Sequence, residues 1–485
     1  MSTDEHVAPA AAGPGADGDV ADRDAPARSA WSVLRPLVLR LHFYAGVLVA
    51  PFLLIAATTG LLYAGSYQAE KIVYGHELRV PAGDTKLPLS RQIAAAREAH
   101  PEGTISAVRP SPDDTGTARV LLSGVKGVAE GHTRAVFVDP YTAKVRGALE
   151  QYGSTGALPL RTWIDEFHRD LHLGQSGRLY SELAASWLWV IAGGGLLLWF
   201  ARRRRNRRAT AESLALNSTA LNSTAPTGGR RRTLALHGGL GVWVAAGLFF
   251  LSATGLTWST YAGANVTDLR AAVGQSTPAV ASGLTGEHAG HGAMPGMDMG
   301  GPDGGHHATD VGYDAVLRAA RAKGLGDPVE IVPPSGPGAA YTVSQIQRSW
   351  PEKQDAVAVA PATGEVTDTV RFADYPLLAK LSRWGIDLHT GVLFGIVNQL
   401  ALAALALSLI LLIVWGYRMW WQRGRAGAFG RPLPRGAWRQ VPVYVLVPSA
   451  VGVAVVGYYL PLLGIPLAAF LAVDIAAGRV AARRA

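Results

Sequence analysis

The sequence predicts a polytopic α-helical membrane protein that carries two small α+β domains outside the membrane. Several apolar runs are as long as the roughly 20 residues that a helix needs to cross a hydrocarbon core. Arginine clusters adjoin the ends of these runs, and the runs themselves recur in a second copy along the chain. We therefore expect a four-helix core built from two parallel repeats, followed by two C-terminal helices.

The apolar runs define six predicted membrane spans. The first four cover about residues 37–64, 183–200, 234–258 and 388–415. The last two form a hairpin at residues 440–478, in which Pro461, Gly464 and Pro466 separate the two helices. An even number of spans places both termini on the same side of the membrane.

The net charge of +9 comes largely from arginine clusters beside the apolar runs, such as Arg202–Arg205 and Arg230–Arg232. Such clusters mark the cytoplasmic ends of membrane helices, so we expect both termini in the cytoplasm and no nucleic-acid partner. The richness in Ala, Gly and Arg suggests a bacterial cytoplasmic membrane. Because the chain has no cysteine, disulfides and thiolate-bound iron–sulfur clusters are excluded. Any metal must be bound by His, Met, carboxylates or backbone.

The predicted organisation follows the two repeats. Residues 1–30 lack apolar periodicity and are expected to form a disordered cytoplasmic tail. Each repeat consists of a helix, an outer domain and a second helix, and each outer domain begins with a helical segment and ends in a strand hairpin. The segments are the first repeat at 31–205, a flexible cytoplasmic linker at 206–232 and the second repeat at 233–422, with extracytoplasmic domains at 65–160 and 311–375.

The internal repeat aligns four histidines. Leu-His opens the first span at His42 and the third span at His237, and a Thr-Gly pair follows each histidine at the same distance. Asp-Leu-His precedes the second span at His172 and the fourth span at His389. Because repeats of equal topology are related by an axis along the membrane normal, His42 and His237 should share one depth near the cytoplasmic face. His172 and His389 should share a second depth near the outer face.

Two imidazoles that face each other across a helix bundle are suited to ligate haem iron. The two matched pairs therefore predict two haem b groups, one near each face of the membrane. The alternative role for each histidine is that of an interfacial or helix-capping residue. His168 lies four residues before His172, on the same face if this segment is helical. It is an alternative ligand, a substrate contact or a structural residue.

Glycines and arginines near the histidines complete this hypothesis. Gly60 and Gly255 lie roughly 27 Å of helix rise beyond His42 and His237, where a missing side chain would leave room for the outer porphyrin. Helix packing through small residues is the alternative. Gly193–Gly195 would serve the inner haem in the same way. The arginines that would neutralise haem propionates are Arg35, Arg40 and Arg232 on the inner side and Arg169 and Arg383 on the outer side.

A His- and Met-rich tract at residues 287–307 is a second candidate metal site. Thioether and imidazole ligands suit copper, Cu(I) above all, so this outer loop is a candidate copper site. The alternative is a glycine-rich disordered insert. The candidate ligands are His288, His291, Met294, Met297, Met299, His306 and His307.

With these motifs the chain resembles the family of proteins with PepSY-associated transmembrane helices, which includes iron-regulated membrane proteins and inner-membrane siderophore reductases. The resemblance covers about Trp31 to Gln422 and rests on the Leu-His openings, on Phe167–His172 and on the Val-Asp-Pro-Tyr-Thr hairpin. It implies PepSY-like outer domains. It also implies a haem-containing oxidoreductase that reduces ferric, often siderophore-bound, iron or another metal on the outer face. The last two spans lie outside this pattern.

The implied partners are membrane lipid, a metal chelate outside, and either a quinol or a cytoplasmic protein as electron donor. A separate donor is needed because the chain has no Gly-x-Gly-x-x-Gly motif in a βαβ context for a flavin or nicotinamide. A non-enzymatic alternative is a PepSY-type regulatory protein or a haem- or copper-binding membrane protein. A metal transporter is least favoured, because apart from Asp474 the spans carry almost no acidic residue.

Overall fold

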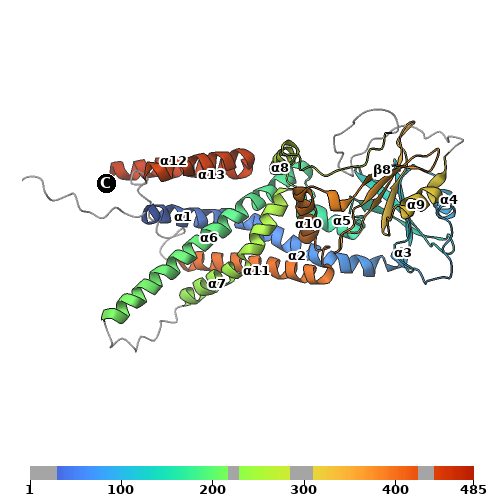
Figure 1. Ribbon diagram of the computed structural model, residues 1–485. Coiled ribbons are helices and arrows are strands. Elements are labelled where there is room, and N and C mark those ends of the chain that lie inside the picture. The colour runs from blue at the N-terminus through green and yellow to red at the C-terminus, as the bar shows by residue number, and fades with distance from the viewer. Residues whose placement is uncertain (1–29, 217–228, 284–309, 424–441, 485) are drawn as a thin grey trace, which may run out of the picture.

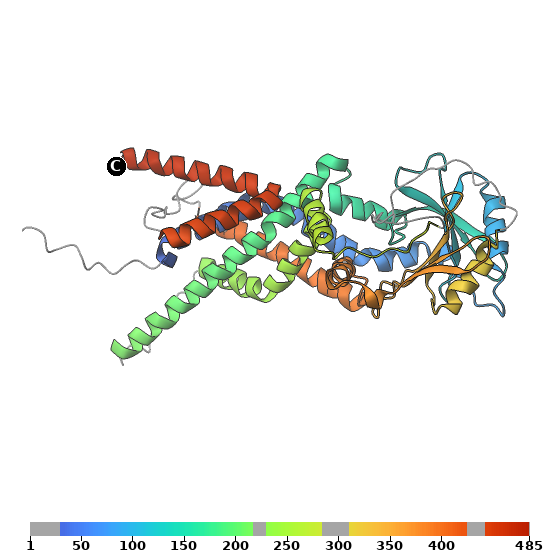
Figure 2. The ribbon, with the colours of Figure 1, turned by 45° about the horizontal axis from the view of Figure 1, so that its top comes forward.

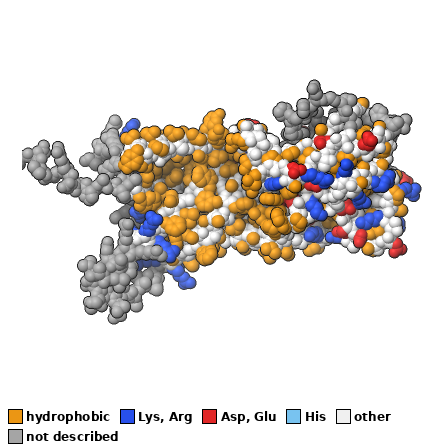
Figure 3. Space-filling model, viewed as in Figure 1, with side chains coloured by type: hydrophobic (Ala, Val, Ile, Leu, Met, Phe, Trp, Pro, Cys, Tyr) orange, Lys and Arg blue, Asp and Glu red, His pale blue; other side chains and the backbone are white. Residues whose placement is uncertain are grey.

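The computed structural model describes residues 30–216, 229–283, 310–423 and 442–484. The molecule is elongated, with long helices at one end and a β-sheet at the other (Figure 1). Apolar side chains cover the helical part, whereas charged side chains gather over the sheet (Figure 3). This division matches a hydrocarbon core beside water. We call the end of the helix bundle that adjoins the sheet the sheet end, and the opposite end the far end.

The described residues contain five helices that are long and apolar enough to cross a membrane. This finding confirms a polytopic helical membrane protein whose spans contact lipid. A sixth apolar helix, α12 (Val443–Tyr459), is shorter, at 17 residues. The five spanning helices are α2 (Ala50–Val73), α6 (Gly174–Leu216), α7 (Gly229–Leu256), α11 (Gly395–Arg423) and α13 (Pro461–Arg484).

The first predicted span, residues 37–64, is divided between α1 (Ala30–Leu48) and α2. The division follows from Pro51, whose ring nitrogen carries no hydrogen and cannot bond to the carbonyl of Val47 four residues earlier. The hydroxyl of Tyr417 on α11 donates to that carbonyl instead, over 2.9 Å. A backbone acceptor inside an apolar bundle is thereby satisfied, as the absence of water in a bilayer requires.

Two predicted boundaries differ in the structure. The linker predicted at residues 206–232 is largely helical where it is described, because α6 continues to Leu216 and α7 begins at Gly229. The fourth span was expected from about Leu388, but α11 begins only at Gly395. The reason is Gly391, whose left-handed φ of 85° ends the preceding helix α10 (Leu377–Thr390). Residues 1–29 of the predicted tail and the tract at 287–307 lie outside the described residues.

The two predicted outer domains form one eight-stranded antiparallel sheet. Each repeat contributes four consecutive strands, and the two sets join where β1 pairs antiparallel with β5, with Val108 opposite Ile331. The order across the sheet is therefore β4-β3-β2-β1-β5-β6-β7-β8. The strands are β1 (Thr104–Arg109), β2 (Ala118–Ser123), β3 (His132–Val138), β4 (Val145–Tyr152), β5 (Val329–Val332), β6 (Tyr341–Gln345), β7 (Ala356–Val359) and β8 (Val366–Val370).

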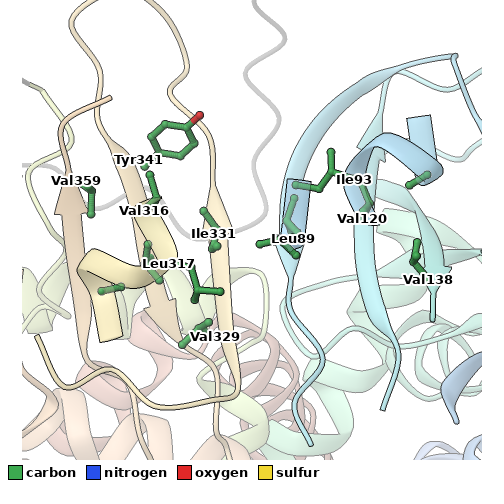
Figure 4. Close-up of a cluster of buried hydrophobic side chains, with 14 of the residues drawn as sticks. Leu89, Ile93, Val120, Val138, Val316, Leu317, Val329, Ile331, Tyr341 and Val359 are labelled. Carbon is green, nitrogen blue, oxygen red and sulfur yellow. The ribbon is translucent and has the colours of Figure 1, made fainter. Parts of the chain in front are cut away.

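One hydrophobic core spans both halves of this sheet. The helices α4 (Leu89–Ala99) and α9 (Gly312–Ala322) contribute buried side chains to it, together with strands from both repeats (Figure 4). The halves are also joined at the start of α4, where the carboxylate of Asp314 accepts hydrogen bonds from the backbone nitrogens of Leu89 and Ser90 at 2.6 and 3.1 Å. A carboxylate at a helix N-terminus satisfies free N–H groups and opposes the helix dipole.

Two short helices connect the sheet to the membrane bundle, as two views of the molecule show (Figures 1 and 2). They are α5 (Pro159–Asp170), which packs against α2 and α6, and α10, which packs against α7 and α11. Within the bundle, α6 packs against α7, and α11 against α2 and α7. The remaining helices are α3 (Gly75–Leu78) and α8 (Tyr261–Ala272), with a 3₁₀ turn at Phe372–Asp374.

The C-terminal helices α12 and α13 pack on the outside of the repeat core. A buried ion pair joins Arg40 on α1 to Asp474 on α13 at 2.6 Å. The indole nitrogen of Trp187 on α6 donates to the carbonyl of Leu462 at 3.1 Å. The isolated acidic residue of the last span therefore neutralises an arginine of the first repeat, so a transport role need not be invoked for it.

Replacing Ile331 by alanine is expected to lower the free energy of unfolding by about 2–5 kcal/mol, because this side chain is fully buried where the two half-sheets meet. Val332→Ala is the matched control, since Val332 is the next residue on β5 but is 39% exposed. It should change stability by less than about 0.5 kcal/mol. Thermal unfolding of the detergent-purified protein measures both, and equal effects would contradict a continuous core.

Candidate functional site

His42 and His237 meet at the far end of the bundle, from α1 and α7. Their ring centroids are 6.4 Å apart and their ring planes lie at 75°. A metal ion held in line between two imidazoles, each at about 2 Å, places the ring centroids roughly 6 Å apart. The separation of this predicted inner pair therefore suits two axial ligands of one metal centre.

Hydrogen bonds fix which nitrogen of each far-end imidazole carries the hydrogen. The Nδ1 atom of His42 lies 2.9 Å from the carbonyl oxygen of Ile191 on α6, and that of His237 lies 3.1 Å from the carbonyl oxygen of Leu412 on α11. A carbonyl can only accept, so each Nδ1 must be the donor. Each Nε2 consequently keeps its lone pair. This arrangement is typical of metal-binding histidines, whose second nitrogen is held by a backbone carbonyl or carboxylate.

Glycines leave room for these two imidazoles. A Cβ atom on Gly195 would lie 3.1 Å from Cε1 of His42, and one on Gly194 would lie 3.4 Å from Cβ of His42. On α11, a Cβ atom on Gly416 would lie 4.0 Å from Cε1 of His237. Of the Gly193–Gly195 run, expected to make space for a porphyrin, Gly194 and Gly195 lie beside the histidine, whereas Gly193 faces Phe249.

A second pair of imidazoles lies at the sheet end. His168 on α5 and His389 on α10 place their Nδ1 atoms 2.8 and 2.6 Å from the hydroxyl oxygens of Thr59 and Thr254, respectively. Each hydroxyl also donates to the carbonyl four residues earlier in its own helix, over 2.8 Å. Because a hydroxyl has one hydrogen to donate, it accepts from Nδ1–H of the histidine. Nε2 again keeps its lone pair.

Both sheet-end imidazoles are uncharged at neutral pH. Burial lowers the pKa of His168 to about 4. Burial, and then the charge that His168 carries when protonated, lower the pKa of His389 to about 3. The two imidazoles thus interact electrostatically, in agreement with their location at the same end of the bundle. Only the neutral form of histidine can ligate a metal.

The structure gives His168, and not His172, the position that corresponds to His389. The same sequence offset relates His168 to His389, Gly195 to Gly416, and Ile191 to Leu412, whose carbonyls accept the hydrogen bonds of the far-end imidazoles. Aligning the two Asp-Leu-His motifs would instead pair His172 with His389, with a sequence offset that is about one helical turn shorter. The cause is the end of α5: Leu171 adopts a left-handed φ of 57°, whereas α10 continues to Thr390.

His172 therefore lies beyond the helix, with a φ of 56°. Its ring packs against Trp163 and Phe167, with centroid separations of 5.1 and 5.9 Å. Its Nδ1 atom lies 3.3 Å from a carboxylate oxygen of Glu166. The structure does not bring His172 together with His389.

Gly60 and Gly255 lie beside the sheet-end histidines. A Cβ atom on Gly60 would lie 3.3 Å from Cε1 of His168, and one on Gly255 would lie 3.9 Å from Cε1 of His389. The two glycines thus occupy equivalent places, as the repeat predicted. On Gly60 the nearest neighbour of such a Cβ atom is the imidazole, whereas on Gly255 it is the Cβ atom of Ala185, at 3.6 Å.

The five arginines expected near haem propionates fall into two groups. Arg40 is paired with Asp474, Arg169 contacts Asp165 and Asp170, and Arg383 contacts Glu352 and Asp387. These three already neutralise carboxylates of the protein. The other two, Arg35 and Arg232, are exposed.

Among the described residues, no group of three or more His, Asp or Glu side chains is placed to hold a metal ion. The candidate copper ligands in the tract at 287–307 lie outside the described residues, so the copper hypothesis stays a prediction. The candidate sites among the described residues therefore consist of two imidazoles each.

Sequence reasoning missed the groups that orient the imidazoles. Thr59 and Thr254 were recognised as part of the repeat, but their hydroxyls were given no role. The Thr-Gly pair was the available signal, since a hydroxyl and a missing side chain side by side suit an imidazole. Nothing in the sequence marks the carbonyls of Ile191 and Leu412 as hydrogen-bond acceptors for the imidazoles, because every residue has a carbonyl.

These features define the class of the protein: a helical membrane protein with paired imidazoles at both ends of a duplicated bundle and a fused sheet at one end. Residues 39–423 match the family described as the PepSY-associated TM region, and the chain belongs to this family. The resemblance inferred from the sequence motifs is thereby confirmed. The match ends with α11, before α12 and α13. A search of curated proteins found no match.

Proposed function

We propose that the protein is a haem b-containing membrane oxidoreductase with two haem sites, ligated by His42 with His237 and by His168 with His389. One observation carries the proposal. All four imidazoles donate their Nδ1 hydrogen to an oxygen of the bundle, so all four present Nε2 as a free ligand. Histidines that only capped or packed helices would not need the same tautomer at four equivalent places.

The two sites lie at different depths. On α1 and α2, His42 and Thr59 are separated by roughly 25 Å of helix rise, which is most of the thickness of a hydrocarbon core. When bound, haem supplies a one-electron iron couple at each site. The chain contributes the axial ligands, their fixed orientation and an apolar surrounding that excludes water.

The direction of electron transfer follows from the charge of the bundle ends. The exposed Arg202–Arg205 cluster lies on α6 toward the far end, which supports a cytoplasmic location for that end. The donor, a quinol or a cytoplasmic protein, would then act at the far end. The substrate, ferric iron in a siderophore or another metal chelate, would bind on the outer face near the sheet. Reduction weakens the hold of hard oxygen ligands on iron and so releases it.

A visible spectrum of the purified, dithionite-reduced protein tests this proposal. We expect split α and β bands of low-spin haem b and two haems per chain in the pyridine hemochromogen assay. Addition of a ferric siderophore to the reduced protein should reoxidise these bands. A protein purified without haem would overturn the proposal. If haem is present but the siderophore does not reoxidise it, the protein binds haem but is not a siderophore reductase.

Deletion of residues 287–307 is expected to leave the haem content and spectrum unchanged, because all four proposed ligands lie in described helices outside this tract. Copper binding by the outer loop, measured by calorimetry with Cu(I), should be lost in the same variant. A changed haem spectrum would instead show that the tract belongs to a haem site.

A further inference from the structure

A pocket of about 550 Å³ lies between the sheet and the membrane bundle. Both repeats line it, with Tyr67 at the end of α2, Arg161 on α5, Arg348 in the loop between β6 and β7, and Val392 after α10. Arg161 lies two helical turns before His168 on α5, about 10 Å along the axis, and Val392 follows His389 by three residues. The pocket is therefore lined by residues of, or directly after, the two helices that carry the sheet-end imidazoles.

Two arginines of the pocket each have one guanidinium nitrogen without a partner. Arg161 contacts the carboxylate of Glu70 through Nε and Nη2, at 3.0 and 3.1 Å. Arg348 donates through Nε to Asp387 at 2.6 Å, and its Nη2 forms a shorter ion pair with the same carboxylate. The Nη1 atoms of both side chains are buried and have no hydrogen-bond partner.

Buried donors of this kind require an acceptor, because leaving them unpaired costs the full desolvation of a charged group. The ion pairs with Glu70 and Asp387 hold both guanidinium planes in place: the side chains of Arg161 and Arg348 are only 4% and 10% exposed. Rigid, planar donors of positive charge are the usual partners of carboxylates.

The two acidic residues that line the pocket are already paired, Asp113 with Arg79 at 3.3 Å and Asp327 with Arg321 at 2.9 Å. The charges of the lining are therefore balanced by ion pairs, and the Oδ1 atom of Asp327 is itself buried without a hydrogen-bond partner. The charge of Arg161 also acts on Arg119, which forms no ion pair with a described carboxylate and donates to Gln151 at 3.2 Å. Burial, and then the charge of Arg109, lower its pKa to about 10, so it remains protonated at neutral pH.

We propose that this pocket binds carboxylate groups of a ligand through the Nη1 atoms of Arg161 and Arg348. The carboxylates belong either to the propionates of a haem at the sheet-end pair or to a carboxylate-bearing metal chelate from solution. The choice between these two occupants rests on the proposed function, but the carboxylate site itself does not. Arg169 and Arg383, the propionate partners expected on this side from the sequence, are also ion-paired with protein carboxylates. Unlike Arg161 and Arg348, they have no buried guanidinium nitrogen that lacks a hydrogen-bond partner among the described residues.

Calorimetric titration of the full-length, detergent-purified protein with citrate tests the site, in the haem-loaded protein and after extraction of haem. We expect Arg348→Lys and Arg161→Lys, which keep the charge but lose the second arm of the fork, to weaken citrate binding at least tenfold. Arg371→Lys is the matched control, since Arg371 forms an ion pair with Asp355 away from the pocket. Both lysine variants are measured, so that the test remains decisive if one of them fails to fold.

Citrate binding in both forms of the protein identifies a soluble chelate as the occupant. Binding only after haem extraction, together with an altered haem spectrum in Arg348→Lys, identifies the propionates. Absence of citrate binding in both forms, with an unaltered spectrum in both lysine variants, would overturn the proposal. If the purified protein contains no haem, the proposed function fails, but the citrate titration still decides whether the carboxylate site exists.

Discussion

Replacement of His237 by alanine is expected to reduce the haem content from two groups per chain to one, with a loss of about half of the reduced α-band absorbance. The imidazole of His237 is one of two that face each other at 6.4 Å, and the remaining His42 cannot supply both axial ligands. Because the sheet-end pair is held by other helices, α5 and α10, its haem should remain. The pyridine hemochromogen assay measures the number directly.

His100→Ala is the control for this experiment. His100 lies outside the bundle, where its Nδ1 atom contacts Glu102 at 3.1 Å, and its loss should leave both haems in place. His42→Ala should reproduce the effect of His237→Ala. Loss of both haems in either variant, in a protein of unchanged thermal stability, would show that the two sites do not bind haem independently.

Replacement of His168 by alanine should remove the haem of the sheet end, whereas replacement of His172 should not. His168 is partly buried, donates to Thr59 and, when protonated, lowers the pKa of His389, while His172 packs on two aromatic rings beyond the end of α5. The two histidines are only four residues apart, so each variant is the matched control of the other. We expect one haem per chain in His168→Ala and two in His172→Ala.

The opposite outcome, loss of haem in His172→Ala alone, would restore the pairing that the Asp-Leu-His match indicates. It would also require the end of α5 to rearrange when haem binds. A Thr59→Val variant adds an independent measurement, since it removes the acceptor for Nδ1 of His168 while keeping the size of the side chain. It should shift the haem spectrum without abolishing binding, because the histidine itself remains.

The membrane spans could be predicted from the sequence, since long apolar runs have few alternative structures. The far-end pair could also be predicted, because His42 and His237 lie within continuous helices at matching positions of the two repeats. The sheet-end pairing could not be predicted in the same way. Its register depends on where α5 ends, which a left-handed residue at Leu171 decides, and leucine gives no signal for that conformation.

The fusion of the two outer domains was also beyond sequence reasoning. Each repeat contains four strands, and the apolar residues of a strand show that it has a buried face without showing which strand lies beside it. The contact between β1 and β5 joins residues more than two hundred positions apart. Capping of α4 by Asp314 is equally remote in sequence.

The antiparallel pairing of β1 with β5 brings equivalent strands of the two copies together across an approximate twofold axis. A single copy would present β1 as an unpaired edge, and an identical second copy would be complementary to that edge. The architecture is therefore that of a homodimer whose subunits have been joined into one polypeptide. Covalent joining freed each half to change on its own, which is how one copy alone could acquire the long His- and Met-rich insertion.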